Sequence, residues 1–282
     1  MIRIGPSGNS NTFYSLGYEH TYQEAKWLSE IGLNAFEYSF GRGVKISEST
    51  AQKIKEEMNK YDIALSVHAP YYTNLANPDS EMVKKTFNYV AESIMAVKMM
   101  GGNRVVFHPA SCGKDTREIA VNRAKDNLEK MMQYLEENLS FSDYIVCPET
   151  MGKNMQIGTA EEIINFCTIS DKLIPCFDFG HINSYSQGAL KTEDDYRRII
   201  DLSYSKLGEY KTNNMHVHFS KIMYGPKGEL KHLTFEDDVY GPNYEPLGKI
   251  IEEYKMSPVI ICESDGTMSD DALKIKKYHK NV

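Results

Sequence analysis

The segment ALSVHAPYYTNLANPDSEMVKKTFNYVAESIMAVKMMGGNRVVFHP, residues 64–109, contains one complete strand–helix–strand pattern. It begins and ends with short β-rich runs, Ala64–His68 and Arg104–His108, which are typical of parallel strands buried on both faces. Between these runs, apolar residues recur at helical spacing from Phe87 to Met100, and Gly101-Gly102 is expected to end the helix. The segment therefore predicts a βαβ unit of a parallel sheet.

The same pattern recurs along the whole chain. Thr21-Tyr22-Gln23-Glu24 and Thr159-Ala160-Glu161-Glu162 read as capping boxes that open two further helices, and Gly32 is expected to end the first of them. No Gly-x-Gly-x-x-Gly motif follows the first strand, which argues against the commonest doubly wound open sheet. We predict a (β/α)₈ TIM barrel, in the α/β class. Its eight expected strands are Ile2–Gly5, Asn34–Ser39, Ala64–His68, Arg104–His108, Tyr144–Glu149, Ile174–Asp178, Met215–Phe219 and Val259–Glu263.

The length and composition fit one soluble domain over residues 1–282. The chain has 282 residues, against roughly 250 for a typical barrel, with 41% hydrophobic and 25% charged residues. No apolar run approaches the ~18 residues of a membrane span, and the chain opens on a strand-like run, so we expect a cytoplasmic monomer with no membrane partner. We expect the five scattered cysteines to be reduced packing thiols. Residues Tyr224–Pro246 are expected to form a long loop after the seventh strand, on the catalytic face.

Acids and histidines lie at or near the carboxyl ends of six successive predicted strands. In a barrel enzyme the carboxyl ends of the strands carry the active site, so these side chains should converge. Carboxylates gathered without partners would repel one another, and bound cations would remove that repulsion. Imidazole and carboxylate ligands without thiolate suit Zn²⁺, Mn²⁺ or Fe²⁺ in a catalytic site, with zinc favoured. The strand-end residues are His68, His108, Glu149, Asp178 with His181, His216 with His218, and Glu263.

The seventh strand offers two histidines. His216 and His218 are two residues apart, so both can face the same side of the sheet. We take His216 as the preferred ligand and leave His218 open as a ligand or as a partner of one.

At these residues the chain resembles the endonuclease IV family (AP endonuclease family 2), within the xylose isomerase-like barrel superfamily, as a divergent member. The resemblance runs over essentially the whole chain. It implies two or three bound zinc ions and hydrolysis of double-stranded DNA 5′ to an abasic site, leaving a 3′-hydroxyl. The motifs that carry it are His68-Ala69-Pro70-Tyr71-Tyr72-x-Asn74-Leu75-Ala76, Phe107-His108-Pro109, Pro148-Glu149-Thr150, Asp178-x-x-His181 and His216.

The resemblance also implies how the ligands are divided among the metals. The first metal would be held by His68, His108 and Glu149, and Glu149 would bridge to a second metal completed by Asp178, His216 and Glu263. The third metal would be held by His181 with two ligands from the loop after the seventh strand. The family has Asp-x-His there, whereas this chain has Glu229-Leu230-Lys231-His232. Glu229 can replace Asp, but a protonated Lys231 cannot bind metal, so His232 or His218 would have to substitute.

Contacts with DNA are expected from an aromatic residue and from basic residues near the strand ends. Tyr72 falls where the family uses an aromatic residue beside the flipped-out abasic nucleotide, and its alternative role is to pack the loop. Arg42, Lys114 and Lys153 could meet phosphates, although each could equally be a solvated surface charge. The net charge of −7 argues against a nucleic-acid partner, but two or three divalent ions in the site would offset it locally.

Two further functions remain open. In the nuclease, metal ions would activate water for in-line attack on phosphorus, Glu149 would bridge, and Glu263 would position or deprotonate the water. A sugar isomerase or epimerase of the same superfamily would need one metal, held by Glu149, Asp178, His216 and Glu263, and Glu37 at the end of the second strand is consistent with it. Such an enzyme would not require His68 and His108. A non-catalytic metal-dependent binding module is the third alternative.

Overall fold

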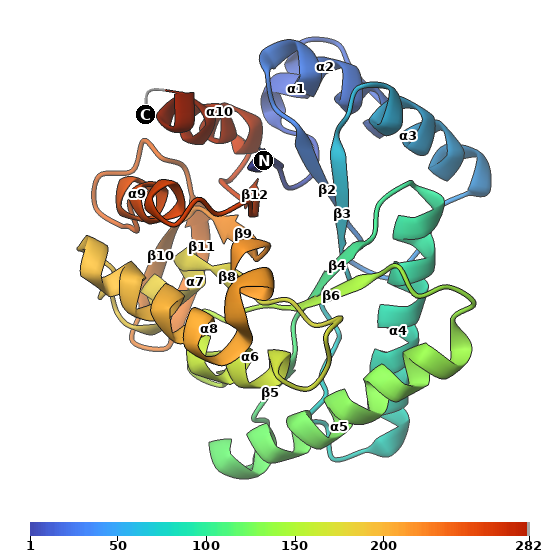
Figure 1. Ribbon diagram of the computed structural model, residues 1–282, viewed down its shortest axis with the longest axis vertical. Helices are drawn as coiled ribbons and strands as arrows, with labels where there is room; N and C mark the ends of the chain where they lie inside the picture. The colour runs from blue at the N-terminus through green and yellow to red at the C-terminus, as the bar shows by residue number, and fades with distance from the viewer. Residues whose placement is uncertain (281–282) are drawn as a thin grey trace.

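Eight parallel strands form a barrel in the computed structural model, which describes residues 1–280 (Figure 1). The last two residues of the predicted domain, 281–282, lie outside the described residues. Each strand matches an expected one to within two residues at either end. They are β1 (Arg3–Pro6), β2 (Ala35–Ser39), β3 (Ala64–His68), β4 (Arg104–Phe107), β6 (Ile145–Pro148), β8 (Cys176–Asp178), β9 (His216–Phe219) and β12 (Val259–Cys262).

Two four-stranded sheets make up the barrel wall. Their orders are β1-β12-β9-β8 and β2-β3-β4-β6, and all pairs within them are parallel. Isolated parallel bridges join the sheets at both seams. Ser7 pairs with Glu37 between β1 and β2, while Val146 and Glu149 pair with Leu173 and Cys176 between β6 and β8. The ring of strands therefore closes, and the predicted TIM barrel is confirmed.

Helices lie outside the strands and begin at the expected kinds of cap. At α6 the predicted capping box is confirmed, because Thr159 accepts from the Glu162 amide and the Glu162 carboxylate accepts from the Thr159 amide. Gly32, with φ 85°, ends α2 as expected. The helices are α1 (Asn11–Ser15), α2 (Glu24–Ile31), α3 (Glu48–Lys60), α4 (Ser80–Met99), α5 (Arg117–Asn138), α6 (Ala160–Cys167), α7 (Phe179–Tyr185), α8 (Glu193–Asn213), α9 (Glu245–Glu253) and α10 (Met268–Lys280).

Two local predictions were wrong. The first capping box lies one residue earlier than expected, because Gln23 bonds back to the amide of His20 and opens a 3₁₀ turn, η1 (Thr21–Gln23), ahead of α2. The segment expected to be a long loop, Tyr224–Pro246, begins inside an antiparallel hairpin of β10 (Lys221–Gly225) and β11 (Gly228–Leu233), and only residues 234–244 are irregular as expected. Gly225, Pro226 and Gly228 form the turn of this hairpin.

The hairpin lies over the carboxyl ends of the strands. Gly228 bridges to Lys153 in the loop after β6, so the hairpin is fastened to that loop. A second short ladder pairs β5 (Ala110–Ser111) with β7 (Gln156–Ile157). Both additions thus extend the end of the barrel at which the predicted ligands lie.

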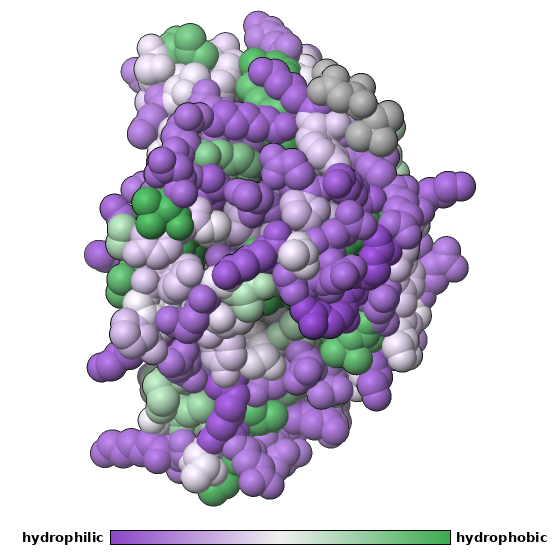
Figure 2. Space-filling model, turned by 90° about the vertical axis from the view of Figure 1, so that its left-hand side faces the viewer, coloured by the Kyte–Doolittle hydropathy of each residue, from purple (hydrophilic) through white to green (hydrophobic). Residues whose placement is uncertain are grey.

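Most buried side chains are apolar, apart from a set of buried acids and histidines at the barrel axis. All five cysteines are free and buried. The face shown in Figure 2 is mainly hydrophilic, with hydrophobic residues in small, separate patches. Among the described residues, no helix combines the length and hydropathy that crossing a bilayer requires.

Candidate metal centre

Glu149 occupies the centre of the site. It directly follows β6, and only 1% of its surface is exposed. Its Oε2 lies 3.1 Å from Nε2 of His68 and 3.2 Å from Nε2 of His108, while its Oε1 lies 2.9 Å from Nδ1 of His218 and 3.4 Å from Nδ1 of His181. One carboxylate therefore faces imidazoles from four different segments, which is the geometry expected of a bridging ligand.

The first group consists of His68, His108 and Glu149, whose donor atoms lie within 4.8 Å of one another. Nδ1 of His68 lies 2.7 Å from the Ala69 carbonyl, so Nδ1–H donates and Nε2 is left with a lone pair toward the group. The ring of Tyr71 lies beside both histidines, with centroid distances of 5.4 Å and 5.6 Å. The three residues predicted from the sequence are thus brought together here.

The second group consists of Glu149, Asp178, His218 and Glu263. The structure places His218, not His216, in this group, so His218 replaces His216 as the candidate ligand of the second metal. The register of the barrel explains why: His218 pairs with Asp178 at the end of β8, whereas His216 pairs with Cys176 two residues deeper. His216 is wholly buried and faces Glu37, with Nε2 3.0 Å from Oε2.

The third group consists of His181, Glu229 and His232. Nε2 of His181 lies 3.4 Å from the Glu229 carboxylate, and Nδ1 of His232 lies 2.8 Å from the hydroxyl of Ser220. Glu229 and His232 both come from β11, so the hairpin that the sequence reading missed supplies two of the three side chains. His232, rather than Lys231 or His218, stands at the position left open by the sequence.

Burial and mutual contact shift the ionisation of the whole site. Burial alone would raise the pKa of Glu149, but the imidazoles of His218, His108 and His181 outweigh it and hold that pKa well below its usual range. Burial raises the pKa of Glu263. Burial disfavours charge on His218 and His181 as well, but facing carboxylates raise the pKa of both well above 6.5. Protonated imidazoles thus balance the negative charge of the carboxylates, a role that divalent cations would also fill.

The donor set fits divalent metals. The three groups offer imidazole nitrogens and carboxylate oxygens only, which suits zinc, manganese or iron in a catalytic site. Oδ2 of Asp178 is buried with no hydrogen-bond partner, as a ligand oxygen would be in the absence of its ion. The imidazole nitrogens and carboxylate oxygens of each group thus lie around one shared position.

Two adjoining cavities open over these groups. One, of about 390 Å³, is lined by members of all three groups together with Lys153 and Gln156. The other, of about 580 Å³, adds Lys231, Ser264 and Asp265 and shares Tyr71 with the first. Tyr71 rather than Tyr72 lines these cavities, while Tyr72 is 59% exposed.

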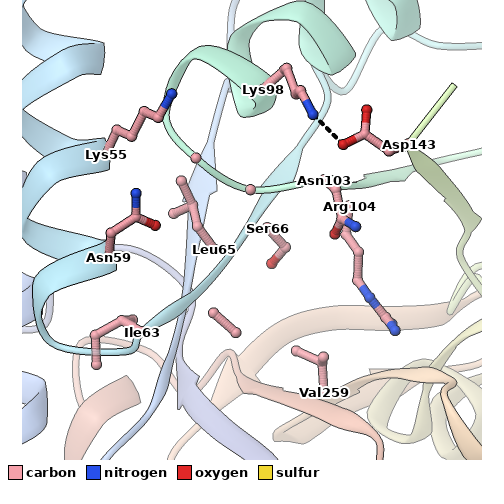
Figure 3. Close-up of a pocket in the computed structure, with 13 residues that line it drawn as sticks. Lys55, Asn59, Ile63, Leu65, Ser66, Lys98, Asn103, Arg104, Asp143 and Val259 are labelled. Carbon is pink, nitrogen blue, oxygen red and sulfur yellow. Dashed lines mark hydrogen bonds and ion pairs between the residues drawn. The ribbon is translucent and has the colours of Figure 1, made fainter. Parts of the chain in front are cut away.

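A third cavity lies at the amino ends of β3 and β4, on the opposite side of the barrel (Figure 3). It measures about 400 Å³, and its charged residues are Lys55, Lys98, Arg104 and Asp143, with Lys98 paired to Asp143. It contains no histidine and one acid, so it lacks a metal-binding donor set.

The structure changes the weight given to two residues named from the sequence, Glu37 and Arg42. Glu37 was noted only as compatible with an isomerase, yet it lies wholly buried against both His216 and His218. Glu37 is the only charged residue of its predicted strand, Asn34–Ser39, and this was the available signal. Arg42 is exposed in the turn after β2 and lines neither cavity over the groups.

The sequence of this chain is similar to those of known proteins. The chain is 32% identical over 281 residues to an uncharacterized protein of Methanocaldococcus jannaschii, MJ0133, covering 99% of this chain and 98% of that one. It is 29% identical over 205 residues to a probable endonuclease 4 of Acholeplasma laidlawii, covering 69% and 65% of the two chains.

Solved structures share the fold at lower identity. Endonuclease IV from Thermus thermophilus superposes with a TM-score of 0.67 at 17% identity, covering 93% of this chain and 94% of that one. A D-tagatose 3-epimerase-like protein superposes with a TM-score of 0.69 at 18% identity, covering 98% and 96%. A model of the xylose isomerase-like TIM barrel family matches residues 25–278. This chain therefore belongs to the xylose isomerase-like TIM barrel family.

Proposed function

We propose that this protein is a zinc-dependent endonuclease that hydrolyses double-stranded DNA on the 5′ side of an abasic site. The observation that carries the proposal is the position of Glu149 between two ligand groups, with a third group of His181, Glu229 and His232 beside it. Phosphodiester hydrolysis uses clustered metals that stabilise the attacking and leaving oxygens together. The similarity to a probable endonuclease 4 supports the same substrate class.

The side chains have separable roles in this proposal. Bound metals would supply Lewis acidity toward the phosphate and lower the pKa of an attacking water. Glu149 would be the ligand shared by the first and second groups. Glu263 lies at the cavity wall, where its carboxylate would position the attacking water or take a proton from it. His181, Glu229 and His232 would hold a cation where the leaving oxygen develops charge.

Binding of DNA would rely on the rim of the cavities. Lys153 and Lys231 line them and can meet phosphates, despite the net charge of −7. Tyr71 is 56% exposed beside the first group and is placed to stack against a nucleotide in the cavity, while Tyr72 and Arg42 remain candidates for contacts farther along the duplex. Selectivity would follow because an abasic nucleotide costs little to unstack.

A sugar epimerase is the second candidate. The set Glu149, Asp178, His218 and Glu263 would hold one metal, with the two glutamates moving a proton beside a polarised carbonyl. A solved structure of D-psicose 3-epimerase, determined in the presence of D-fructose, shares the fold with a TM-score of 0.63. This function gives no role to His108, His181 or His232.

Removal of the third group separates the two candidates. The zinc-loaded protein is incubated with a duplex oligonucleotide carrying one abasic site, with and without EDTA, and separately with ketose sugars. We expect EDTA-sensitive incision 5′ to the lesion, falling at least about 100-fold in His181→Asn and His232→Asn, the scale of losing one electrostatic stabiliser of a transition state.

The matched control is His20→Asn, an exposed histidine at the start of η1, far along the chain from every ligand. It should leave incision unchanged. Absence of incision together with turnover of a ketose that survives both third-group substitutions would reject the nuclease in favour of the epimerase.

A further inference from the structure

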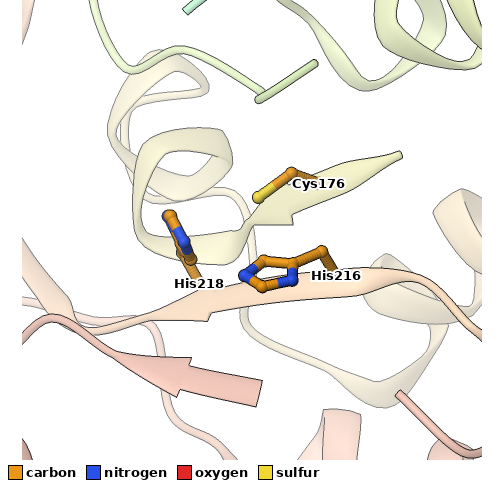
Figure 4. A group of neighbouring side chains, drawn as sticks. All are labelled: Cys176, His216 and His218. Atoms are coloured by element: carbon orange, nitrogen blue, oxygen red, sulfur yellow. The ribbon is translucent and has the colours of Figure 1, made fainter. Parts of the chain in front are cut away.

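Inside the barrel, below the open site, lies a group of donors of which the proposed function uses only His218. Sγ of Cys176 and ring nitrogens of His216 and His218 lie within 4.8 Å of one another (Figure 4). All three residues have 0% of their surface exposed. Cys176 and His216 are direct neighbours across the β8–β9 ladder, so the barrel register itself holds them together.

Glu37 completes this group from the opposite wall of the barrel. Its Oε2 lies 3.0 Å from Nε2 of His216, and its Oε1 lies 2.9 Å from Nε2 of His218. The hydroxyl of Ser66 donates to Oε2 at 2.8 Å and fixes the carboxylate. Ser66 also lines the cavity of Figure 3, so one side chain separates this interior group from that cavity.

One polar atom of the group has no partner. Nε2 of His216, Nε2 of His218 and Oε1 of Glu37 take part in the close Glu37 contacts, although without an aligned hydrogen bond. Nδ1 of His216 is buried with neither a hydrogen bond nor an ion pair among the described residues, and leaving a buried polar atom unpaired is costly. A metal ion that binds this ring would remove that cost.

We infer that Cys176, His216, His218 and Glu37 form an interior binding site for one divalent metal ion of the zinc type, which adjoins the open site at His218. A tetrahedral ion with metal–nitrogen bonds of about 2.0–2.1 Å and a metal–sulfur bond of about 2.3 Å places its ligands roughly 3.3–3.6 Å apart. The 4.8 Å spread of the Cys176, His216 and His218 donors allows this after small shifts, and the Glu37 oxygens lie 2.9–3.0 Å from the two Nε2 atoms. All coordination positions would be filled by protein, as in a structural site.

Charge balance supports a divalent ion. A thiolate at Cys176 and the carboxylate of Glu37 contribute two negative charges, and two neutral imidazoles contribute none. One M²⁺ makes the buried group neutral, which avoids the cost of an uncompensated charge inside the barrel.

His218 connects this site to the open one. Its Nδ1 lies 2.9 Å from Glu149 and its Nε2 lies 2.9 Å from Glu37, so each nitrogen faces a different group. A neutral imidazole has one lone pair, so with Nε2 on the interior ion His218 would keep its proton on Nδ1 and donate it to Glu149. An interior ion would thus orient the central carboxylate of the open site through His218, which would then be a partner of Glu149 rather than a direct ligand of the second group.

Cobalt substitution tests the inference, because only this site contains a thiol. The full-length protein is stripped with a chelator, loaded with Co²⁺ and examined by absorption spectroscopy and metal analysis. We expect a near-ultraviolet thiolate-to-cobalt charge-transfer band, and in Cys176→Ser the loss of that band together with about one equivalent of metal. The control is Cys147→Ser, an equally buried thiol that packs against Cys176 from β6; it should keep both band and metal.

X-ray absorption at the zinc edge of the unmutated protein provides a second measurement that does not depend on folding of a variant. One sulfur neighbour at about 2.3 Å is expected. A zinc shell of nitrogen and oxygen alone, or a thiolate band that survives Cys176→Ser, overturns the inference. Neither readout involves DNA, so the result is independent of whether the protein is a nuclease.

Discussion

Glu149→Gln should remove most of the stabilisation that zinc gives the protein. The substitution keeps the size of the side chain but weakens one of three ligands in the first group and one of four in the second. Loss of a residue that merely orients a ligand costs 10–100-fold in metal affinity, so we expect a loss of about 100-fold or more. At free zinc a thousandfold above Kd, bound metal adds about 4.1 kcal/mol, and a hundredfold loss of affinity removes about 2.7 kcal/mol of it.

Thermal unfolding measures this loss. At about 2–4 °C per kcal/mol for a chain of this size, the zinc-induced rise in Tm should shrink by roughly 5–10 °C in Glu149→Gln, and chelator competition should show the weaker affinity directly. The control Glu92→Gln makes the same change on an exposed face of α4 and should retain the full rise. A Glu149→Gln protein with an unchanged zinc-induced rise would refute the bridging role of this carboxylate.

The metal-free protein provides a second, independent readout of the same residue. Because the folded-state pKa values of His181 and His218 are raised above 6.5, the native state holds extra protons, and its stability should fall as pH rises from about 6.5 through those values. Zinc affinity should change in the opposite direction, since the imidazoles must lose their protons to bind metal. Glu149→Gln should flatten the metal-free slope, because the carboxylate helps to raise both pKa values.

Three further outcomes are expected. Burial raises the pKa of Glu24 to about 8 and leaves both carboxylate oxygens unpaired, so the free energy of unfolding should fall as the pH rises from 4.5 to 8. In urea titrations at pH 8, Glu24→Gln should therefore raise the free energy of unfolding by on the order of 1–3 kcal/mol. An unchanged free energy would contradict this. Lys153→Ala and Lys231→Ala should each weaken binding to duplex DNA irrespective of sequence, and each should reduce the slope of log K against log salt concentration by about one. An unchanged slope would place these lysines outside the interface. Tyr71→Ala should lower kcat/KM for abasic DNA more than Tyr72→Ala does, since Tyr71 and not Tyr72 lines the cavity. The reverse order in steady-state assays would instead support the prediction from sequence that Tyr72 lies beside the abasic nucleotide.

The barrel and most of the site could be predicted because both follow from local pattern. Continuous apolar runs fix strands, and once eight strands close a ring, their last residues must face one another. His68, His108 and Glu149 were therefore found together without any knowledge of long-range contacts. Their prediction required only that the end of each strand be located correctly.

The errors arose where the answer depends on a partner strand. His216 and His218 face the same side of β9, and only the register with β8 brings His218 level with Asp178 and leaves His216 level with Cys176. The hairpin was missed for a related reason: its strands contain lysines and glutamate, and pairing across the turn rather than hydrophobic pattern forms them. Glu37 could be noticed as a polar residue in a strand, but its contacts with two histidines come from across the barrel.

The difference between the two candidate functions can be traced to segments outside the last four strands of the barrel. Glu149, Asp178, His218 and Glu263 suffice for a one-metal enzyme, so a hydrolase and an epimerase could share them unchanged. The hydrolase needs further cation positions, and their donors come from β3, β4, the first turn of α7 and the hairpin. The hairpin also contributes Lys231 to the cavity rim and is fastened at Gly228 to the loop that carries Lys153. In the proposed hydrolase this hairpin would supply donors for a third metal and positive charge for a phosphate backbone at the same time, and a small neutral sugar needs neither.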